Sequence, residues 1–266
     1  MQPLSQLDAS QVLGVLTDID DTLTTHGALT GAAYCALARL KQAGFAIVPV
    51  TGRSAGWAHM IIRTWPVDAV IAESGGLYLY RDPARAHLLH RYYDDEARVR
   101  ADRLRLAQCA DRVLAAVPGL RTASDNAFRL VDLALDYCEE VPRVADHDVR
   151  RAIDLFVASG FSARASSVHI NAWAGQFDKG PTALRCLAEV FAGSPLASPA
   201  RWLCVGDAPN DESMFEAFAL SVGVANIAAS LDRLAHPPAF VTQAECGAGF
   251  VELADHLIRS RSAGIR

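Results

Sequence analysis

The segment Val12–Thr25, VLGVLTDIDDTLTT, joins a short apolar run to three carboxylates placed within four positions. The apolar run, Val12–Leu16, ends at polar residues, which is typical of a buried strand. Asp18 and Asp20 share one parity along an extended chain and can face the same pocket, whereas Asp21 points the other way. Two carboxylates this close repel each other unless a proton or a cation lies between them. We therefore expect a metal ion here, most naturally Mg²⁺, which prefers hard oxygen ligands.

The length and composition are those of a globular protein. The chain has 266 residues, of which 51% are hydrophobic and 21% charged. This is enough for one large domain or two smaller ones. The formal net charge of −5 and the lack of a basic stripe argue against a nucleic-acid partner.

The six cysteines are scattered, without a CxxC pair or the spacing of zinc ligands, so we expect reduced thiols and a cytoplasmic location. The N-terminus lacks a basic segment followed by an apolar one, so we expect no signal peptide. No apolar run approaches the roughly 18 residues that a membrane span needs, so we expect no membrane partner.

Strand and helix patterns alternate through both ends of the chain, which predicts an α/β fold. The expected strands lie within residues 12–16, 45–50, 67–72, 202–205, 221–227 and 239–242, and the expected helices within 29–40, 54–64, 182–191 and 247–259. Thr30 is a plausible N-cap of the first helix, and Gly44 a plausible C-cap. A turn at 74–76 leads from the third strand into a short hairpin arm.

Residues 84–174 form a unit of their own. Their pattern predicts a helix at 94–117, strands at 120–124 and 128–137, a second helix at 146–159, and strands at 161–165 and 167–173. The order αββαββ is that of an antiparallel sheet with helices on one face. The core would then consist of residues 1–83 and 175–266, although a decorated single domain without a mobile part is the alternative.

Three further motifs stand at strand ends or helix starts: TGR at 51–53, DKG at 178–180 and GDAPND at 206–211. A hydroxyl and a glycine at a strand end suit an anion, since the hydroxyl donates and the backbone N–H groups are accessible. Lys179 at a helix start opposes the helix dipole unless an anion lies there. Taken singly, each motif could also be an ordinary turn or a solvated charge.

Taken together, these motifs and DIDDT at 18–22 resemble, in the same order, the four motifs of the haloacid dehalogenase (HAD) superfamily of phosphotransferases. The segment inserted between the second and third motifs resembles the C2B-type cap of that superfamily. The resemblance covers nearly the whole chain and implies a doubly wound, mainly parallel sheet core with an inserted α+β cap. The arrangement looks like the Cof, sucrose-phosphate and mannosyl-3-phosphoglycerate phosphatase groups. It departs from relatives at Glu73–Gly76, where they often have Asn-Gly.

The resemblance implies a Mg²⁺-dependent phosphomonoester hydrolase that acts on a small phosphorylated metabolite, above all a sugar phosphate, through an aspartyl-phosphate intermediate. Asp18 would be the nucleophile and Asp20 the general acid and base, assisted by Lys179. The phosphoryl group would be bound by Thr51, Gly52, Lys179 and Asn210. The metal would be bound by Asp18, Asp20 through its backbone carbonyl, Asp207 and Asp211. Asp21 receives no catalytic role.

The cap is expected to close over the leaving group and to supply specificity. Its polar candidates are Asp125, Asn126, Arg129, Arg164, Ser166, His169, Asn171 and Trp173, with Asn126, Arg129, Arg164, His169 and Asn171 favoured. Alternate positions of any sheet can instead simply face solvent. A phosphomutase of the phosphomannomutase type and a non-catalytic binding protein are the alternative functions. The protein would be a monomer or a homodimer.

Overall fold

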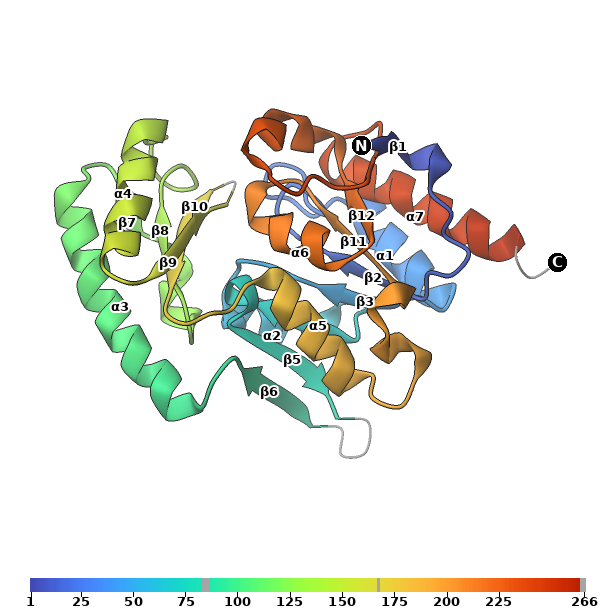
Figure 1. The fold of residues 1–266 in the computed structure, drawn as a ribbon, viewed down its shortest axis with the longest axis horizontal. Coiled ribbons are helices and arrows are strands. Elements are labelled where there is room, and N and C mark those ends of the chain that lie inside the picture. Colours follow the sequence, from blue (N-terminus) through green and yellow to red (C-terminus); the bar gives the residue numbers. More distant parts are fainter. Residues whose placement is uncertain (83–86, 167, 264–266) are drawn as a thin grey trace.

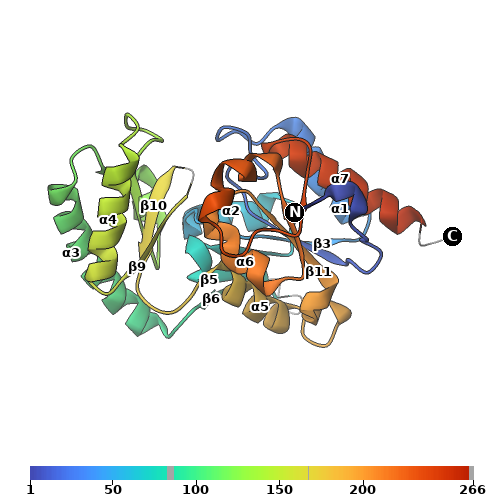
Figure 2. The ribbon, with the colours of Figure 1, turned by 45° about the horizontal axis from the view of Figure 1, so that its top comes forward.

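The structure is a computed structural model, which describes residues 1–82, 87–166 and 168–263. Two bodies lie side by side: a core that holds both ends of the chain, and a smaller cap formed by an internal segment (Figure 1). A second view, turned about the horizontal axis, shows the same separation, with the cap sheet between the cap helices and the core (Figure 2). This agrees with the predicted fold class.

A six-stranded parallel sheet runs through the core. Its order is β1 (Gln2–Pro3), β13 (Phe240–Val241), β12 (Leu220–Gly223), β11 (Trp202–Gly206), β2 (Gly14–Thr17) and β3 (Ala46–Pro49). Parallel neighbours need crossover connections, which place helices over the sheet faces. The two-residue strand β1 at the sheet edge was not expected from the sequence.

Helices cover both faces of this sheet, α1 (Gly31–Gln42) and α7 (Cys246–Ala263) on one face, and α5 (Lys179–Val190) and α6 (Glu212–Ala217) on the other. Val15 packs into the first layer and its neighbour Leu16 into the second, because successive strand residues point to opposite faces. Strands buried on both faces have continuous apolar sequences, as seen here. The doubly wound core is therefore confirmed.

The predicted third strand leaves the parallel pattern. β4 (Ala69–Ala72) forms one isolated parallel bridge, between Ile71 and Val50, the residue that follows β3. It otherwise pairs antiparallel with β5 (Leu77–Arg81), which pairs in turn with β6 (Leu88–Tyr92). β6 lies within the range that the sequence assigned to the cap, yet it extends a sheet of the core. The predicted boundary after residue 83 lies outside the described residues, and we place the junction between core and cap after β6.

The cap is a four-stranded antiparallel sheet with two helices on one face. Its strand order is β7 (Arg121–Thr122), β8 (Leu133–Asp136), β10 (His169–Trp173) and β9 (Ser162–Ala165), covered by α3 (Glu96–Ala116) and α4 (Asp146–Ala158). The predicted strands at 120–124 and 128–137 are both longer than those observed. A short 3-10 helix, Ser124–Phe128, separates them, and the next N–H groups donate to a core carboxylate instead of a strand.

The two faces of the cap sheet have different partners. Ile170 and Ala172 of β10 pack beneath the cap helices. The alternate residues His169 and Asn171 line a cavity between the cap and the core. The cap thus presents a polar face to the ends of the core strands.

Candidate active site

A cluster of buried charges lies at the C-terminal end of β2. Asp18 follows this strand directly, and its Oδ1 lies 2.8 Å from the Lys179 Nζ at the start of α5. The same ammonium lies 2.7 Å from Asp211 Oδ1. The Lys179 and Asp211 side chains are fully buried, and Asp18 is 4% exposed. Residues from three distant motifs are therefore joined by direct charged contacts.

Two glycines let these elements approach one another. A Cβ at Gly180 would lie 2.0 Å from the backbone oxygen of Ser213, so only glycine allows α5 to start against this segment. A Cβ at Gly206 would lie 2.4 Å from Asp211 Oδ2. That oxygen accepts hydrogen bonds from the N–H groups of Asp207 and Ala208, at 3.0 and 3.3 Å. The loop after β11 is thus folded around the Asp211 carboxylate.

The cluster contains more negative than positive charge. Burial raises the pKa of Asp18 to about 7, and the Asp211 carboxylate adds to this while Lys179 opposes it. Burial also raises the pKa of Asp207 well above its ordinary value, again assisted by Asp211. Burial would lower the pKa of Lys179, but its two carboxylate partners raise it. Two of the three buried carboxylates, Asp18 and Asp211, thus share one ammonium, and Asp207 has no contact with it.

This donor set fits a divalent cation. One oxygen each of Asp18, Asp207 and Asp211 lie within 4.8 Å of one another, and all three residues are buried. The Asp207 carboxylate is oriented by the hydroxyl of Thr22 at 3.0 Å and the amide of Asn226 at 3.1 Å. Carboxylate oxygens that are closely spaced and lack neutralising charge are the ligands that Mg²⁺ and Ca²⁺ prefer. The acidic cluster could therefore bind a metal ion.

Asp20 is held by an arginine that the sequence motif contained but to which no role was assigned. Arg53 Nε lies 3.1 and 3.0 Å from the two carboxylate oxygens of Asp20, and Nη2 lies 2.9 Å from Oδ1. The guanidinium carbon lies 5.0 Å from the centre of the Trp57 ring. The Asp20 side chain is 18% exposed. Its neighbour Asp21 accepts a hydrogen bond from the His26 N–H and stabilises a turn.

The predicted phosphate-binding residues lie around the same cluster. Thr51, buried after β3, accepts a hydrogen bond from the Arg53 N–H at 3.0 Å, which leaves its hydroxyl proton free to donate. Gly52 and Asn210 line the cavity. The Asn210 Oδ1 is buried and has no hydrogen-bond partner within the described part of the protein. Gly52 and Asn210 thus share one cavity with Asp18, and Lys179 contacts Asp18 directly.

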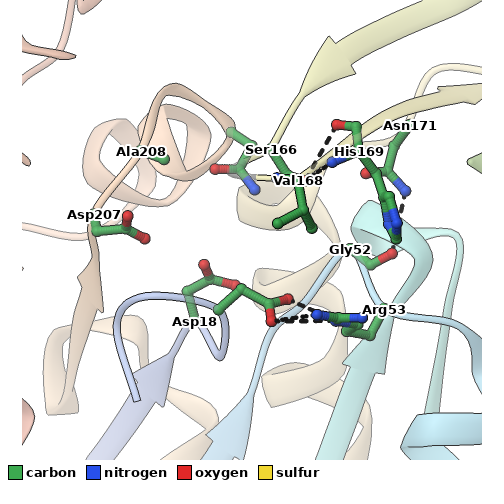
Figure 3. A pocket seen from close by; sticks show the side chains of 11 residues that line it. Asp18, Gly52, Arg53, Ser166, Val168, His169, Asn171, Asp207 and Ala208 are labelled. Carbon is green, nitrogen blue, oxygen red and sulfur yellow. Dashed lines mark hydrogen bonds and ion pairs between the residues drawn. The ribbon is translucent and has the colours of Figure 1, made fainter. Parts of the chain in front are cut away.

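The cavity has a core side and a cap side (Figure 3). The core side consists of Asp18, Asp20, Gly52, Arg53, Asp207, Ala208 and Asn210, and the cap side of Ser166, Val168, His169 and Asn171. The free space between them is about 10 Å³, which is room for about one water molecule. This cavity is too small for a phosphorylated metabolite, so we call the arrangement of cap and core closed.

Two of the predicted cap residues form hydrogen bonds to the backbone of the core. Arg129 Nη1 and Asn171 Nδ2 both donate to the carbonyl oxygen of Gly52, at 2.8 and 3.2 Å. The Arg129 side chain is fully buried and forms ion pairs with Asp125 and Asp132. It therefore holds the cap to the core and does not line the cavity.

Three other candidates lie away from the cavity. Asn126 hydrogen bonds to the backbone of Ala123 and Ala134 within the cap. Arg164 lies on the edge strand β9 and reaches Asp178 at 2.8 Å instead of the cavity. Trp173 is buried, and its indole N–H donates to the backbone oxygen of Phe177. These three side chains bind structural partners. Of the cap residues named from the sequence, Ser166, His169 and Asn171 line the cavity.

Sequence reasoning missed two glutamates at the boundary between core and cap. The carboxylate of Glu73, which follows β4, accepts backbone hydrogen bonds from Ala55 in the core and from residues 130–132 in the cap. Glu139, in the turn after β8, reaches Arg53 Nη1 at 3.0 Å. The sequence did contain a signal for Glu73, because Glu73–Gly76 stands where relatives often have Asn-Gly. Glu139 has no such signal, because nothing in its local pattern distinguishes it from a solvated turn residue.

The comparisons with known proteins concern the fold. No family model matches the chain, and no curated protein is significantly similar in sequence. The C-terminal domain of a C. albicans trehalose-6-phosphate phosphatase is similar in structure, with a TM-score of 0.70 at 16% identity over 97% of this chain and 99% of that one. The sucrose-phosphatase of Synechocystis sp. PCC6803, solved with sucrose and phosphate, has a TM-score of 0.65 at 17% identity over 92% and 97%.

A phosphatase of the haloalkanoate (HAD) superfamily from Bacteroides thetaiotaomicron gives a TM-score of 0.61 at 17% identity, over 93% of this chain and 96% of that one. The chain has the HAD fold with a cap. All four motifs named from the sequence lie at the place where this HAD-like core meets its cap. None of the helices in the described part of the chain combines the length and apolar character that a membrane crossing requires.

Proposed function

We propose that this HAD-like protein is a Mg²⁺-dependent phosphomonoester hydrolase for a small phosphorylated metabolite. The observation that carries the proposal is the buried cluster of Asp18, Lys179, Asp207 and Asp211, two members of which, Asp18 and Asp207, line the same cavity as Asp20. It supplies a nucleophile, an acid and base, a fixed ammonium and the ligands of a cation. Few structural roles would require so many buried charges at one strand end, because burying unpaired carboxylates is costly.

Mg²⁺ would be held by Asp18, Asp207 and the backbone carbonyl of Asp20, with Asp211 beside them. When bound, it would neutralise these carboxylates and offset the repulsion between Asp18 and a phosphoryl dianion. Lys179 remains bonded to Asp18 and Asp211 and would contact the phosphoryl oxygens from the side opposite the metal ion. The Thr51 hydroxyl and the Gly52 N–H would donate to the same oxygens, with Asn210 nearby.

The chain's own residues then account for both steps. An oxygen of Asp18 attacks phosphorus, the bond from phosphorus to the leaving oxygen breaks, and Asp20 gives that oxygen a proton. In the second step Asp20 takes a proton from water, which attacks phosphorus and releases phosphate from Asp18. The closed cavity excludes bulk water while the intermediate exists.

A sugar phosphate is the substrate class that we favour. Two of the structurally similar proteins are named for sucrose and trehalose 6-phosphate. The cap side of the cavity offers a hydroxyl, an imidazole and an amide, from Ser166, His169 and Asn171. Such groups suit a leaving group rich in hydroxyls. We also propose a cytoplasmic location, which the six cysteines outside disulfide bonds support, and a monomer or homodimer.

A phosphomutase is less well supported, because it would have to hold a second phosphate on the cap side. Among the described residues that line the cavity, Arg53 is the one Lys or Arg, and Asp20 and Glu139 already neutralise it. Arg129, the nearby cap guanidinium, is neutralised by Asp125 and Asp132. This charge balance favours hydrolysis of a monophosphate.

A screen of phosphorylated metabolites with Mg²⁺ tests the proposal. We expect release of free phosphate from at least one sugar phosphate and from 4-nitrophenyl phosphate, and loss of both activities in Asp18→Asn. Isomerised sugar phosphate without free phosphate would instead indicate a mutase. Absence of turnover with every phosphomonoester would support a binding protein and contradict the proposal.

A further inference from the structure

The turn after β8 carries Glu139 into the active site. Three successive backbone N–H groups, from Cys138, Glu139 and Glu140, donate to the carboxylate of Asp136 at 2.9, 2.7 and 2.8 Å. Asp136 is itself 3% exposed. The turn is therefore anchored by a buried acceptor, and the position of Glu139 follows from the cap sheet.

Glu139 forms the cap end of a chain of charges that crosses to the core. One carboxylate oxygen lies 3.0 Å from Arg53 Nη1, and the other lies 2.7 Å from His169 Nε2. These two contacts hold the pKa of Glu139 at about 2, with His169 contributing most, so the group carries its negative charge at any assay pH. The Nε and Nη2 of the same guanidinium bind Asp20.

We propose that Glu139 is a positioning residue for the reaction: it clamps Arg53 from the cap, and Arg53 holds the Asp20 carboxylate in place for proton transfer to the leaving oxygen. The inference rests on the proposed function. A free arginine side chain has many rotamers, and fixing one costs conformational entropy. Trp57 covers one face of the guanidinium, and Glu139 fixes its Nη1 end, so both restrict Arg53 to the conformation that faces Asp20.

The clamp can form only when the cap is closed. Glu139 belongs to the cap and Arg53 to the core, and the closed cavity has room for about one water molecule. A substrate must therefore bind while the two residues are apart. Closure of the cap over the substrate then excludes water and brings Glu139 into contact with Arg53 in the same movement. Asp20, the acid and base, is therefore held firmly only over a bound leaving group.

The test is the dependence of turnover on the leaving group. A 4-nitrophenolate leaves without a proton, phenolate is intermediate, and an alkoxide requires a proton from Asp20. We expect Glu139→Gln to lower kcat for ethyl phosphate by roughly 10-fold or more, and kcat for 4-nitrophenyl phosphate by about 2-fold or less, with phenyl phosphate between them. Circular dichroism and thermal melting of the variant should match those of the wild-type protein.

Glu140→Gln is the matched control. Glu140 is the next residue of the same turn, but its carboxylate accepts from the Ser124 hydroxyl and does not reach Arg53. We expect wild-type rates with all three substrates. An equal loss for the three substrates in Glu139→Gln would mean a merely structural role, and an unchanged rate with ethyl phosphate would mean none; either result refutes the clamp. A wild-type protein that hydrolyses none of the three refutes the proposed function and the clamp with it.

A double-mutant cycle gives a second readout. Lysine keeps the charge of Arg53 but cannot contact two carboxylates with a planar fork. If Glu139 acts through Arg53, adding Glu139→Gln to Arg53→Lys should change kcat for ethyl phosphate by less than about 2-fold, because the partner is already lost. Independent, multiplicative losses in the double variant would contradict this coupling.

Discussion

Different interactions hold the residues on the two sides of the cavity in place. The floor, formed by Asp18, Lys179, Asp207 and Asp211, consists of charged side chains of the core in direct, buried contact. The roof, formed by the cap, reaches the core through ion pairs of Glu139 and Arg164, through hydrogen bonds to backbone groups and through a shared apolar cluster. Opening the cap would leave every floor contact intact and would break the roof contacts. The catalytic groups of the floor can therefore keep their positions while the cap opens and closes over the cavity.

The largest expected effect concerns the floor nucleophile. Asp18→Asn removes the attacking carboxylate but keeps its shape, and kcat should fall by about 10⁴-fold or more, as for other catalytic nucleophiles. Phosphate release under saturating substrate measures this, with circular dichroism as the check on folding. Rates equal to those of the wild-type protein, from a preparation free of contaminating phosphatase, would remove Asp18 from the mechanism.

The second prediction compares how much the buried ion pairs of the floor and a surface ion pair contribute to stability. Lys179→Met leaves the Asp18 and Asp211 carboxylates without their shared ammonium, and the free energy of unfolding should fall by about 3–5 kcal/mol. Lys41→Met is the control, because Lys41 pairs with Asp68 at the surface and should cost less than about 1 kcal/mol. Denaturant unfolding measures both. Similar losses for the two variants would contradict the special role assigned to the buried cluster.

Metal removal tests the charge balance of the floor. Exhaustive chelation should lower turnover roughly 100-fold or more, because the repulsion between the carboxylates and the phosphoryl group is no longer offset. Added Mg²⁺ should restore it. Isothermal titration of Mg²⁺ into the wild-type protein and Asp207→Asn, in the absence of substrate, should show binding that the variant weakens. Undiminished turnover after chelation would mean that the cluster works without a cation.

The smallest effect concerns the roof. Glu73→Gln keeps one carbonyl acceptor where the carboxylate accepts several backbone N–H groups, so the amides of residues 130–132 should lose protection from hydrogen exchange by about 1–3 kcal/mol. Glu252→Gln is the control, because Glu252 accepts backbone N–H groups only within the core. Unchanged exchange at 130–132 in Glu73→Gln would show that this carboxylate does not hold the cap.

The same contrast explains what the sequence could predict. Asp18 and Asp20 follow a recognisable strand with equal parity, and Lys179 stands at a helix start, so local patterns place them at strand ends that a parallel sheet brings together. The fold class and the residues that gather at the floor follow from this. The pairing of Arg53 with Asp20 does not, because it links side chains 33 positions apart through their rotamers.

The roof could be predicted only in outline. The αββαββ order was visible, but the choice among polar candidates was not. Arg164 and Asn171 are cross-strand partners, yet Arg164 lies on the edge strand and reaches Asp178, whereas Asn171 lies on an inner strand and faces Gly52. Glu139 depends on a turn whose direction is set by the buried Asp136. Such choices are made by tertiary packing, which local periodicity does not encode.

The most direct test of the account is to trap the intermediate. Wild-type protein mixed with excess 4-nitrophenyl phosphate and Mg²⁺ is quenched in acid within milliseconds, and its peptides are analysed by mass spectrometry. The account predicts one phosphoryl group on the peptide that contains Asp18, and none in Asp18→Asn. Steady turnover with a phosphoryl group on another residue would contradict it.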